Sequence, residues 1–268
     1  MHVPKRPPEI HILVACMPKS GSTLLSEALA SLPGMRRASL VPGHQRREQE
    51  ICLKRIEDEI RKTDLLHQIW FQNKELLPRP RGFVAQMHLR HSSPSQEIFD
   101  AYNVVPVVLV RNIFDVVVSL RDHFEQIAPT IPMAYVSEEM RTWPEERMYQ
   151  FIAELVVPWY INFFTCWSYS PAAVRVTYEN LVEDLPGTVN RVAISCGLRT
   201  GGLKSVEDIV SGIEGDKTRQ NKGVVGRGSV LPDEIRYKIR QYAKFYPNVD
   251  FSPIGLPRPK KFWRKAKS

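Results

Sequence analysis

The sequence predicts a single α/β domain in which a central parallel sheet is flanked by helices. Residues 10–17 and 104–110 are short, rich in β-branched residues and apolar on both faces, which is typical of strands buried between two helical layers. Segments with helical periodicity alternate with the strand-like segments, the order that produces parallel sheets. The chain has 268 residues, without an internal repeat or a long linker, and this length suits one large domain.

The individual elements follow from these patterns. Strands are expected at residues 10–17, 82–88, 104–110 and 172–178. Helices are expected at residues 22–32, 48–70, 112–124, 146–167, 187–196 and 232–245, and the first ends at the stop signal Leu32-Pro33-Gly34. Residues 33–70 are the least strand-like part, and their amphipathic helix either packs on the core or covers a substrate. We place the domain at residues 1–256 and a basic, irregular tail at residues 257–268.

The positive charge is concentrated at the C-terminus. The chain has 37 Lys and Arg against 29 Asp and Glu, a net charge of +8. Six of these charges belong to the tail, which contains no acidic residue: Arg258, Lys260, Lys261, Arg264, Lys265 and Lys267. The rest of the chain is nearly neutral, which argues against a nucleic-acid-binding protein but leaves a local anion site open. The tail itself is a candidate for peripheral contact with an acidic membrane.

The cysteines indicate the compartment and exclude some site types. Cys16, Cys52, Cys166 and Cys196 are scattered, without a C-x-x-C pair or the spacing of a zinc site. We therefore expect a reducing, cytoplasmic location and no metal centre. The most apolar stretch, residues 151–167, is too short and too interrupted to span a bilayer, so we expect a buried helix there.

The first candidate site is the turn that follows the first strand. Its residues Lys19, Ser20, Gly21, Ser22 and Thr23 connect a buried strand to a helix N-terminus. Such a turn exposes backbone N–H groups and the positive end of the helix dipole, a combination that binds oxyanions. It is not a Walker A loop, because the lysine precedes the glycine. The alternative is an ordinary strand–turn–helix with a serine N-cap.

The second candidate site follows the strand at residues 104–110. Arg111 stands at the carboxyl end of this strand, the edge where α/β proteins bind ligands. Ser119 comes about two helical turns later, so both side chains are candidates for one phosphate. Asp115 lies in the first helical turn, where we expect it to act on the helix dipole or brace a loop.

A third, weaker candidate is the glycine-rich and basic segment at residues 219–229, which includes Lys222 and Gly223. Its glycines allow close approach of the backbone to a ligand. Its cations are suited to an anion, although such loops are often merely solvated.

Together these segments resemble the sulfotransferase family that uses 3′-phosphoadenosine 5′-phosphosulfate (PAPS). PKSGST is similar to the family's 5′-phosphosulfate loop, VLVRNIFDVVVS to its 3′-phosphate motif, and NKGVVG to its late R-K-G-x-x-G loop. The tetrapeptide YENL, beginning at Tyr178, resembles the family's Y-E-D-L element near the adenosine. The resemblance implies a P-loop-NTPase-like sulfotransferase fold, with PAPS as co-substrate and no metal.

The resemblance also implies roles for individual residues. Lys19 is expected to contact the bridging oxygen of the phosphosulfate, while residues 20–23 bind the 5′-phosphate. The 3′-phosphate is assigned to a further set, Arg111, Ser119, Lys222 and Gly223. Several positions depart from the family pattern. Ile113 replaces the usual Pro of the 3′-phosphate motif, Leu24 stands where many members have an adenine-stacking Trp, and Asn221 replaces the Arg of R-K-G. Either Arg219 or Arg227 is a candidate to compensate for Asn221.

Transfer of a sulfuryl group to an alcohol needs a base for the acceptor proton, and histidine is suited to this near neutral pH. The resemblance places His88 at the position of the family's catalytic histidine, with Gln86 in place of the associated lysine. His91 and a carboxylate are the alternatives, and His123 is expected to line the acceptor pocket. The predicted reaction is in-line transfer to a hydroxyl group of a small molecule, glycolipid or saccharide.

Two other functions compete with this prediction. A P-loop-like nucleoside or sugar kinase would share the sheet and the first turn, but the chain lacks the Gly-Lys-[Ser/Thr] order and a clear acidic ligand for Mg²⁺. A non-catalytic module that binds nucleotides or membranes is the second alternative. The sequence leaves the acceptor and the oligomeric state open.

Overall fold

A computed structural model describes all of the chain except residues 1–8, 42–50, 73–77, 132, 215–222 and 259–268. Its centre is a five-stranded parallel sheet with the strand order β2-β3-β1-β4-β7. The strands are β1 His11–Cys16, β2 Arg37–Ala38, β3 Val84–Met87, β4 Val104–Val110 and β7 Val174–Thr177. The short strands β5 Thr130–Ile131 and β6 Ala134–Tyr135 form a separate antiparallel pair.

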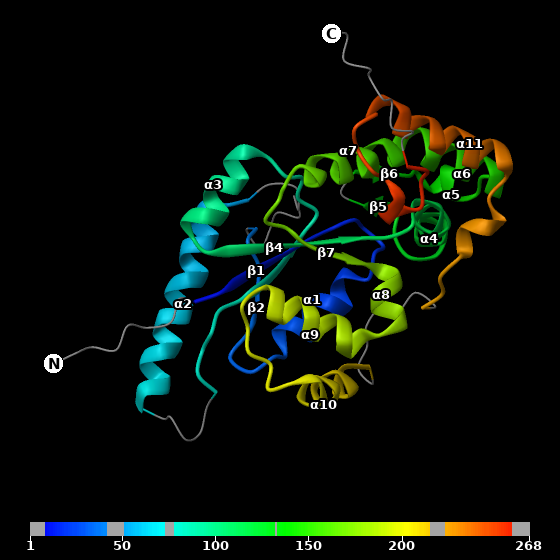
Figure 1. The fold of residues 1–268 in the computed structure, drawn as a ribbon. Helices are drawn as coiled ribbons and strands as arrows, with labels where there is room; N and C mark the ends of the chain where they lie inside the picture. Colours follow the sequence, from blue (N-terminus) through cyan, green and yellow to red (C-terminus); the bar gives the residue numbers. More distant parts are fainter. Residues whose placement is uncertain (1–8, 42–50, 73–77, 132, 215–222, 259–268) are drawn as a thin grey trace, which may run out of the picture.

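Helices cover both faces of the sheet (Figure 1). Their bounds are α1 Ser22–Ala30, α2 Leu53–Gln72, α3 Ser93–Ala101, α4 Ile113–Gln126, α5 Glu138–Arg141, α6 Glu145–Phe151, α7 Val157–Ser168, α8 Tyr178–Glu183, α9 Leu185–Ser195, α10 Leu203–Glu214 and α11 Asp233–Tyr242. Short 3₁₀ segments lie at Arg227–Val230, Ala243–Phe245 and Ser252–Ile254.

The two apolar cores follow from the alternation of side chains in β1. Leu13 and Ala15 face a core shared with α2, α3, α4, α7 and α11. Ile12, Val14 and Cys16 face the opposite core, formed with α1, α9 and α10. All six residues of β1 are buried, and five of them, Ile12 to Cys16, are apolar, as expected for a strand covered on both faces.

The expected α/β class, the parallel sheet and its four main strands are confirmed. The structure adds elements that the sequence patterns did not predict, namely β2, α3, α5, α8, α10 and the β5–β6 pair. Tyr178 is the first residue of α8 rather than the last residue of a strand. The two-residue strand β2 lies within the segment that we considered least strand-like, and it forms because it pairs with β3.

The helix expected at residues 146–167 is divided by a π-helical segment, Ile152–Val156, between α6 and α7. Pro158, near the start of α7, has no N–H to donate to the preceding turn, which explains the break. The hydroxyl of Tyr242 donates a hydrogen bond to the carbonyl oxygen of Ala153 at 3.0 Å. This contact from α11 stabilises the irregular turn.

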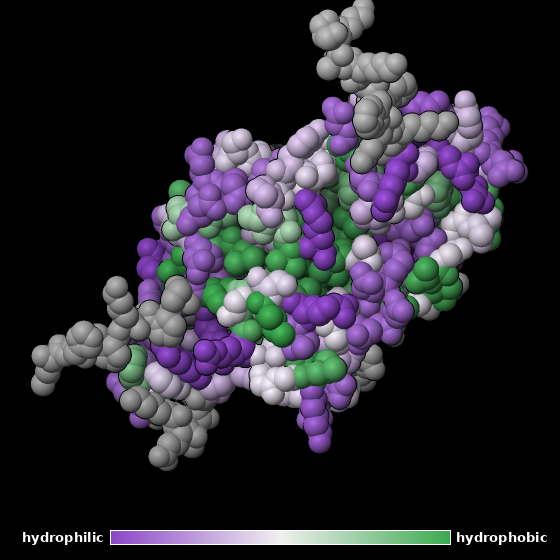
Figure 2. Space-filling view, in the orientation of Figure 1, coloured by the Kyte–Doolittle hydropathy of each residue, from purple (hydrophilic) through white to green (hydrophobic). Residues whose placement is uncertain are grey.

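The surface mixes apolar and hydrophilic side chains. Figure 2 shows apolar side chains gathered over the centre of one face, with hydrophilic side chains around them. Within the described ranges, no helix combines the length and apolar character needed to cross a membrane.

Candidate functional site

The predicted site segments follow neighbouring strands of the parallel sheet. The turn containing Lys19 follows β1, His88 follows β3, Arg111 follows β4 and Tyr178 follows β7. Since parallel strands end at the same edge of a sheet, this topology brings the four segments together.

The turn after β1 has the backbone geometry of an anion cradle. Lys19 and Gly21 both have left-handed conformations, with φ of 67° and 82°. Gly21 is the N-cap of α1, and no side chain caps this helix. The first N–H groups of a helix have no acceptor within the helix, so here they are available to an anion.

Three contacts fix the shape of this turn. A Cβ atom at Gly21 would lie 2.9 Å from Cδ2 of Tyr178, so the glycine is required by packing as well as by its φ. Ser20 is fully buried, and its hydroxyl donates to the carbonyl oxygen of Met17 at 2.6 Å. The Ser20 side chain therefore braces the turn. The hydroxyl of Tyr160 on α7 donates to the carbonyl oxygen of Pro18 at 3.3 Å.

Arg111 joins the cradle to two other segments of the site. Its Nη1 donates to the carbonyl oxygen of Lys19 at 2.9 Å, and its Nη2 donates to that of Val224 at 3.2 Å. The guanidinium carbon also lies 4.0 Å from the centre of the Tyr178 ring, within the range of a cation–π contact. Arg111 thus connects β1, the late glycine-rich loop and α8.

Arg111 is deeply buried, and its Nη2 lies 3.9 Å from Oδ2 of Asp115, a long ion pair. The side chain is 2% exposed, and its Nε has no hydrogen-bond partner. Burial lowers the pKa of Arg111 from its ordinary value, and the interactions with Tyr178, Asp115 and Glu179 offset only part of this shift. An unpartnered donor on a buried cation favours an anionic ligand, so the chemistry of Arg111 is suited to a phosphate group.

Asp115 holds the late loop against α4. Its carboxylate accepts hydrogen bonds from the backbone N–H groups of Gly226 at 2.8 Å and Gly228 at 2.7 Å. Gly228 is required here, since a Cβ atom would lie 2.3 Å from Cβ of Phe114. The expectation that Asp115 braces a loop is confirmed. Ser119, one helical turn later, is fully buried on the same side of α4.

The predicted residues of the late loop are only partly described. Gly223 has a left-handed φ of 55°, while Lys222, Asn221 and Arg219 lie outside the described residues. Arg227 forms an ion pair with the largely buried Asp122. This pairing engages the charge of Arg227, which we considered as a substitute for the missing motif arginine.

The two candidate histidines have different environments. Nδ1 of His88 lies 2.8 Å from the carbonyl oxygen of Cys16. A carbonyl only accepts, so Nδ1 carries the proton of the neutral ring and the lone pair belongs to Nε2. In contrast, Nε2 of His91 lies 3.1 Å from Oε1 of Gln96. The centre of the His91 ring lies 5.1 Å from the centre of the Trp167 ring. The two rings thus differ in the nitrogen that the structure shows engaged, Nδ1 in His88 and Nε2 in His91.

The structure adds residues whose roles the sequence did not indicate. Gln86 donates from Nε2 to the hydroxyl oxygen of Ser22 at 2.9 Å, which links β3 to the cradle. Glu179 accepts a hydrogen bond from the backbone N–H of Asn112 at 3.0 Å and fixes the end of β4 against α8. The only sequence signal for Glu179 was its place in YENL. In the part of the chain that the structure describes, no group of three or more His, Cys, Asp or Glu residues is placed to hold a metal ion.

Comparison with known proteins connects this geometry to a family. A family model described as a sulfotransferase domain matches residues 9–230. The solved structure of mouse sulfotransferase SULT7A1 complexed with PAP has a TM-score of 0.59 and 15% identity, covering 90% of this chain and 85% of that chain. Retinol dehydratase in complex with androsterone and inactive cofactor PAP has a TM-score of 0.53 and 13% identity, covering 90% of this chain and 81% of that chain. Curated protein sequences gave no match. At such identities, the structural similarity shows a shared fold.

Proposed function

Because this chain belongs to the sulfotransferase domain family, we propose that it transfers a sulfuryl group from PAPS to a hydroxyl group of an acceptor. The observation that carries the proposal is Arg111, a buried cation with one unpartnered donor that contacts both the cradle and the late loop. Two similar structures contain PAP, adenosine 3′,5′-bisphosphate. PAP is what remains of PAPS after the sulfuryl group has been transferred. PAPS supplies the activated sulfuryl group, and the protein supplies binding and proton transfer.

We assign the donor's two phosphate regions to the two anion-binding segments. The 5′ side is held by the backbone N–H groups of residues 20–23, the hydroxyls of Ser22 and Thr23, and the charge of Lys19. The 3′-phosphate is held by Arg111 and Ser119 together with the late loop at Lys222 and Gly223. Support comes from the left-handed turn of the cradle and from Asp115, which fixes the late loop beside Arg111.

We assign the base to Nε2 of His88. The hydrogen bond from Nδ1 to the carbonyl oxygen of Cys16 fixes the ring so that Nε2 can take a proton from the acceptor hydroxyl. As negative charge moves onto the leaving phosphate, Lys19 and the N-terminus of α1 stabilise it. No metal ion is assigned to this site.

Transfer of labelled sulfate tests the proposal. Purified protein is incubated with ³⁵S-labelled PAPS and a panel of phenols, steroids, retinoids, glycolipids and saccharides; retinol and androsterone are included because similar structures contain them. We expect label on at least one class of hydroxyl acceptor, with no requirement for added Mg²⁺. PAP binding without transfer to any acceptor would favour a non-catalytic module, and phosphate transfer from ATP would favour a kinase.

Paired histidine variants then test the base. His88→Ala should retain PAP binding and lose turnover by about 10²-fold or more, the contribution typical of general base catalysis. His91→Ala is the matched control, since His91 is engaged with Gln96 and Trp167. Full turnover in His88→Ala, or a larger loss in His91→Ala, would contradict the assignment.

We also propose that the enzyme works in the cytoplasm. All four cysteines are free thiols in the structure, which is consistent with a reducing compartment. The basic residues beyond Arg258 lie outside the described residues, so contact of this tail with an acidic membrane stays a prediction. Fractionation of cells expressing the tagged full chain, with and without residues 259–268, tests both points.

A further inference from the structure

We propose that Arg37 is a positioning residue that acts through Gln86 to set the direction of the Ser22 hydroxyl at the anion cradle. The proposal deepens the proposed function, because it concerns how the same cradle presents a donor to the 5′ phosphosulfate. Arg37 belongs to none of the motifs of the sequence analysis. It lies on β2, the short edge strand that the sequence did not predict.

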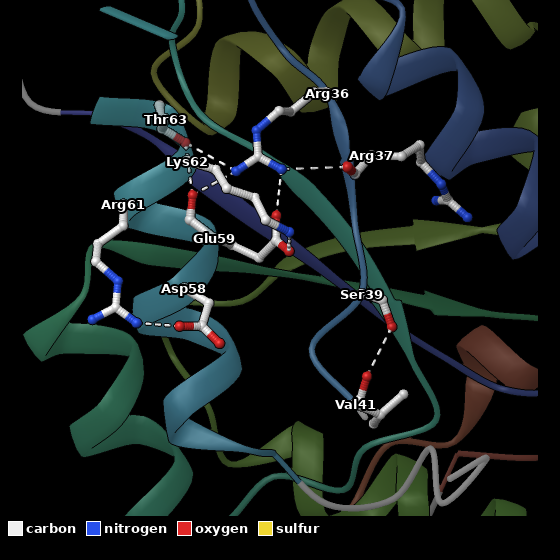
Figure 3. Close-up of polar contacts among 9 residues, drawn as sticks. All are labelled: Arg36, Arg37, Ser39, Val41, Asp58, Glu59, Arg61, Lys62 and Thr63. Carbon is white, nitrogen blue, oxygen red and sulfur yellow. Dashed lines mark hydrogen bonds and ion pairs between the residues drawn. The ribbon is translucent and has the colours of Figure 1, made fainter. Parts of the chain in front are cut away.

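Arg36, which directly precedes β2, and Arg37, the first residue of β2, point to opposite faces of the sheet. Figure 3 shows Arg36 directed to α2 and Arg37 directed away from it, as expected for consecutive residues of an extended chain. Arg36 contacts the carboxylate of Glu59, donates to its carbonyl oxygen at 2.5 Å, and donates to the hydroxyl of Thr63 at 3.1 Å. Because Glu59 is 4% exposed, this is a buried anchor that fixes β2 in place.

With β2 fixed, Arg37 is held between α1 and β3. Its Nε forms an ion pair with Oε1 of Glu27 on α1 at 3.2 Å. Its Nη2 donates to Oε1 of Gln86 at 3.5 Å, a long hydrogen bond. Gln86 in turn donates from Nε2 to the oxygen of Ser22 at 2.9 Å. Ser22 is the first residue of α1 and directly follows the glycine of the cradle.

Only one order of donors and acceptors satisfies this chain of hydrogen bonds. A guanidinium has donors and no acceptor, so the amide oxygen of Gln86 must face Arg37. The amide NH₂ of Gln86 therefore faces Ser22, whose oxygen accepts. The hydroxyl hydrogen of Ser22 is then left to donate to another acceptor, and this is the polarity that an oxyanion in the cradle requires.

Loss of Arg37 removes the constraint on this polarity. The Gln86 amide can then rotate by half a turn and present its oxygen to Ser22. The Ser22 hydroxyl would donate to Gln86 and direct a lone pair at the bound anion. Arg37 thus acts at a distance, without a contact to the ligand.

Affinity for PAP in a double-mutant cycle tests the proposal. Arg37→Met should weaken PAP binding by about tenfold, the scale of one hydrogen bond to a charged group, and Ser22→Ala should have a similar effect. In the Ser22→Ala background, Arg37→Met should have no further effect. Gln86→Glu, which can only accept from Ser22, should also weaken binding, whereas Arg37→Lys should restore most of the affinity.

Two controls separate this role from a merely structural one. Arg61, also drawn in Figure 3, pairs with Asp58 on α2 and is largely exposed, so Arg61→Met should leave PAP affinity unchanged. Glu27→Gln breaks the ion pair with α1 but keeps Arg37 beside Gln86, so it should change PAP affinity less than twofold. Additive effects of Arg37→Met and Ser22→Ala, or an unchanged affinity in Arg37→Met, would overturn the proposal.

A readout without ligand distinguishes this proposal from the proposed function. The NMR signal of the Gln86 side-chain NH₂ should shift in Ser22→Ala and in Arg37→Met and stay unchanged in Arg61→Met. If these shifts occur but the wild-type protein binds no PAP, the proposed function fails and the polarity of Ser22 stands. If PAP binds but Arg37→Met leaves the Gln86 signal unchanged, the proposal for Arg37 fails alone.

Discussion

Replacement of Asp115 by alanine tests whether this carboxylate holds the late loop against α4. It accepts backbone hydrogen bonds at 2.8 and 2.7 Å and is 2% exposed. A hydrogen bond to a charged group contributes about 1.5–3 kcal/mol, and the cost of burying the carboxylate offsets part of the gain from two such bonds. We expect the free energy of unfolding to fall by about 3 kcal/mol, which lowers the Tm by about 6–12 °C for a domain of this size.

Calorimetric unfolding of three variants provides the assay. Asp115→Asn keeps one acceptor oxygen and should lie between the wild type and Asp115→Ala. Asp233→Ala is the matched control, because Asp233 is an exposed acidic residue in the first turn of α11 and its interaction with the helix dipole amounts to about 0.3–1 kcal/mol. If Asp115→Ala lowers the Tm no more than Asp233→Ala, Asp115 acts on the helix dipole alone and the bracing of the loop is refuted.

Two further predictions concern the cradle and the opposite end of the sheet. Gly21→Ala should weaken PAP binding by about tenfold or more, because its φ of 82° and the Tyr178 ring exclude a side chain; Gly212→Ala, where nothing lies within 4 Å of a new Cβ atom, should leave it unchanged in titration calorimetry. Burial and the charge of Arg36 lower the pKa of His11 from 6.5 to about 4. At a pH between these two values, His11 is protonated in the unfolded chain and neutral in the folded chain. The free energy of unfolding should therefore fall by about 2 kcal/mol from pH 7 to pH 5 through His11 alone. Denaturant unfolding of His11→Gln should lack this part of the decrease, and an unchanged pH dependence in that variant would exclude His11 as its cause.

The parts of the fold that the sequence predicted are those with a strong local pattern. β1 and β4 lie at the centre of the sheet, where nearly every position is buried, so apart from His11 at the start of β1 each strand is a continuous apolar run. β2 has only two residues, and its position depends on pairing with β3 and on the contact between Arg36 and Glu59. Those partners lie far away in the sequence, and no local pattern reports them. The helix α3 did have a signal, a capping box in which Ser92 and Ser95 satisfy each other's backbone N–H groups.

The candidate site shows the same division. The motifs indicated Lys19, Arg111 and Tyr178 because strand ends and glycine turns are visible in the sequence. The proton position on His88 depends on the carbonyl oxygen of Cys16, a backbone atom 72 residues away. The link from Arg37 to Ser22 through Gln86 depends on three elements that meet only in the folded chain. The sequence thus indicated several candidate residues, and the structure was needed for the contacts and the hydrogen-bond polarity that connect them.

The central claim is that the cradle, Arg111 and the late loop form one binding site for adenosine 3′,5′-bisphosphate. Isothermal titration calorimetry of the full chain with PAP, and separately with ATP and Mg²⁺, tests it most directly. We expect saturable binding of PAP with a stoichiometry near one per chain, much weaker binding of ATP, and loss of PAP binding in Arg111→Met. Absence of PAP binding to the folded wild-type protein, or tight binding of ATP with Mg²⁺ in its place, would contradict the claim.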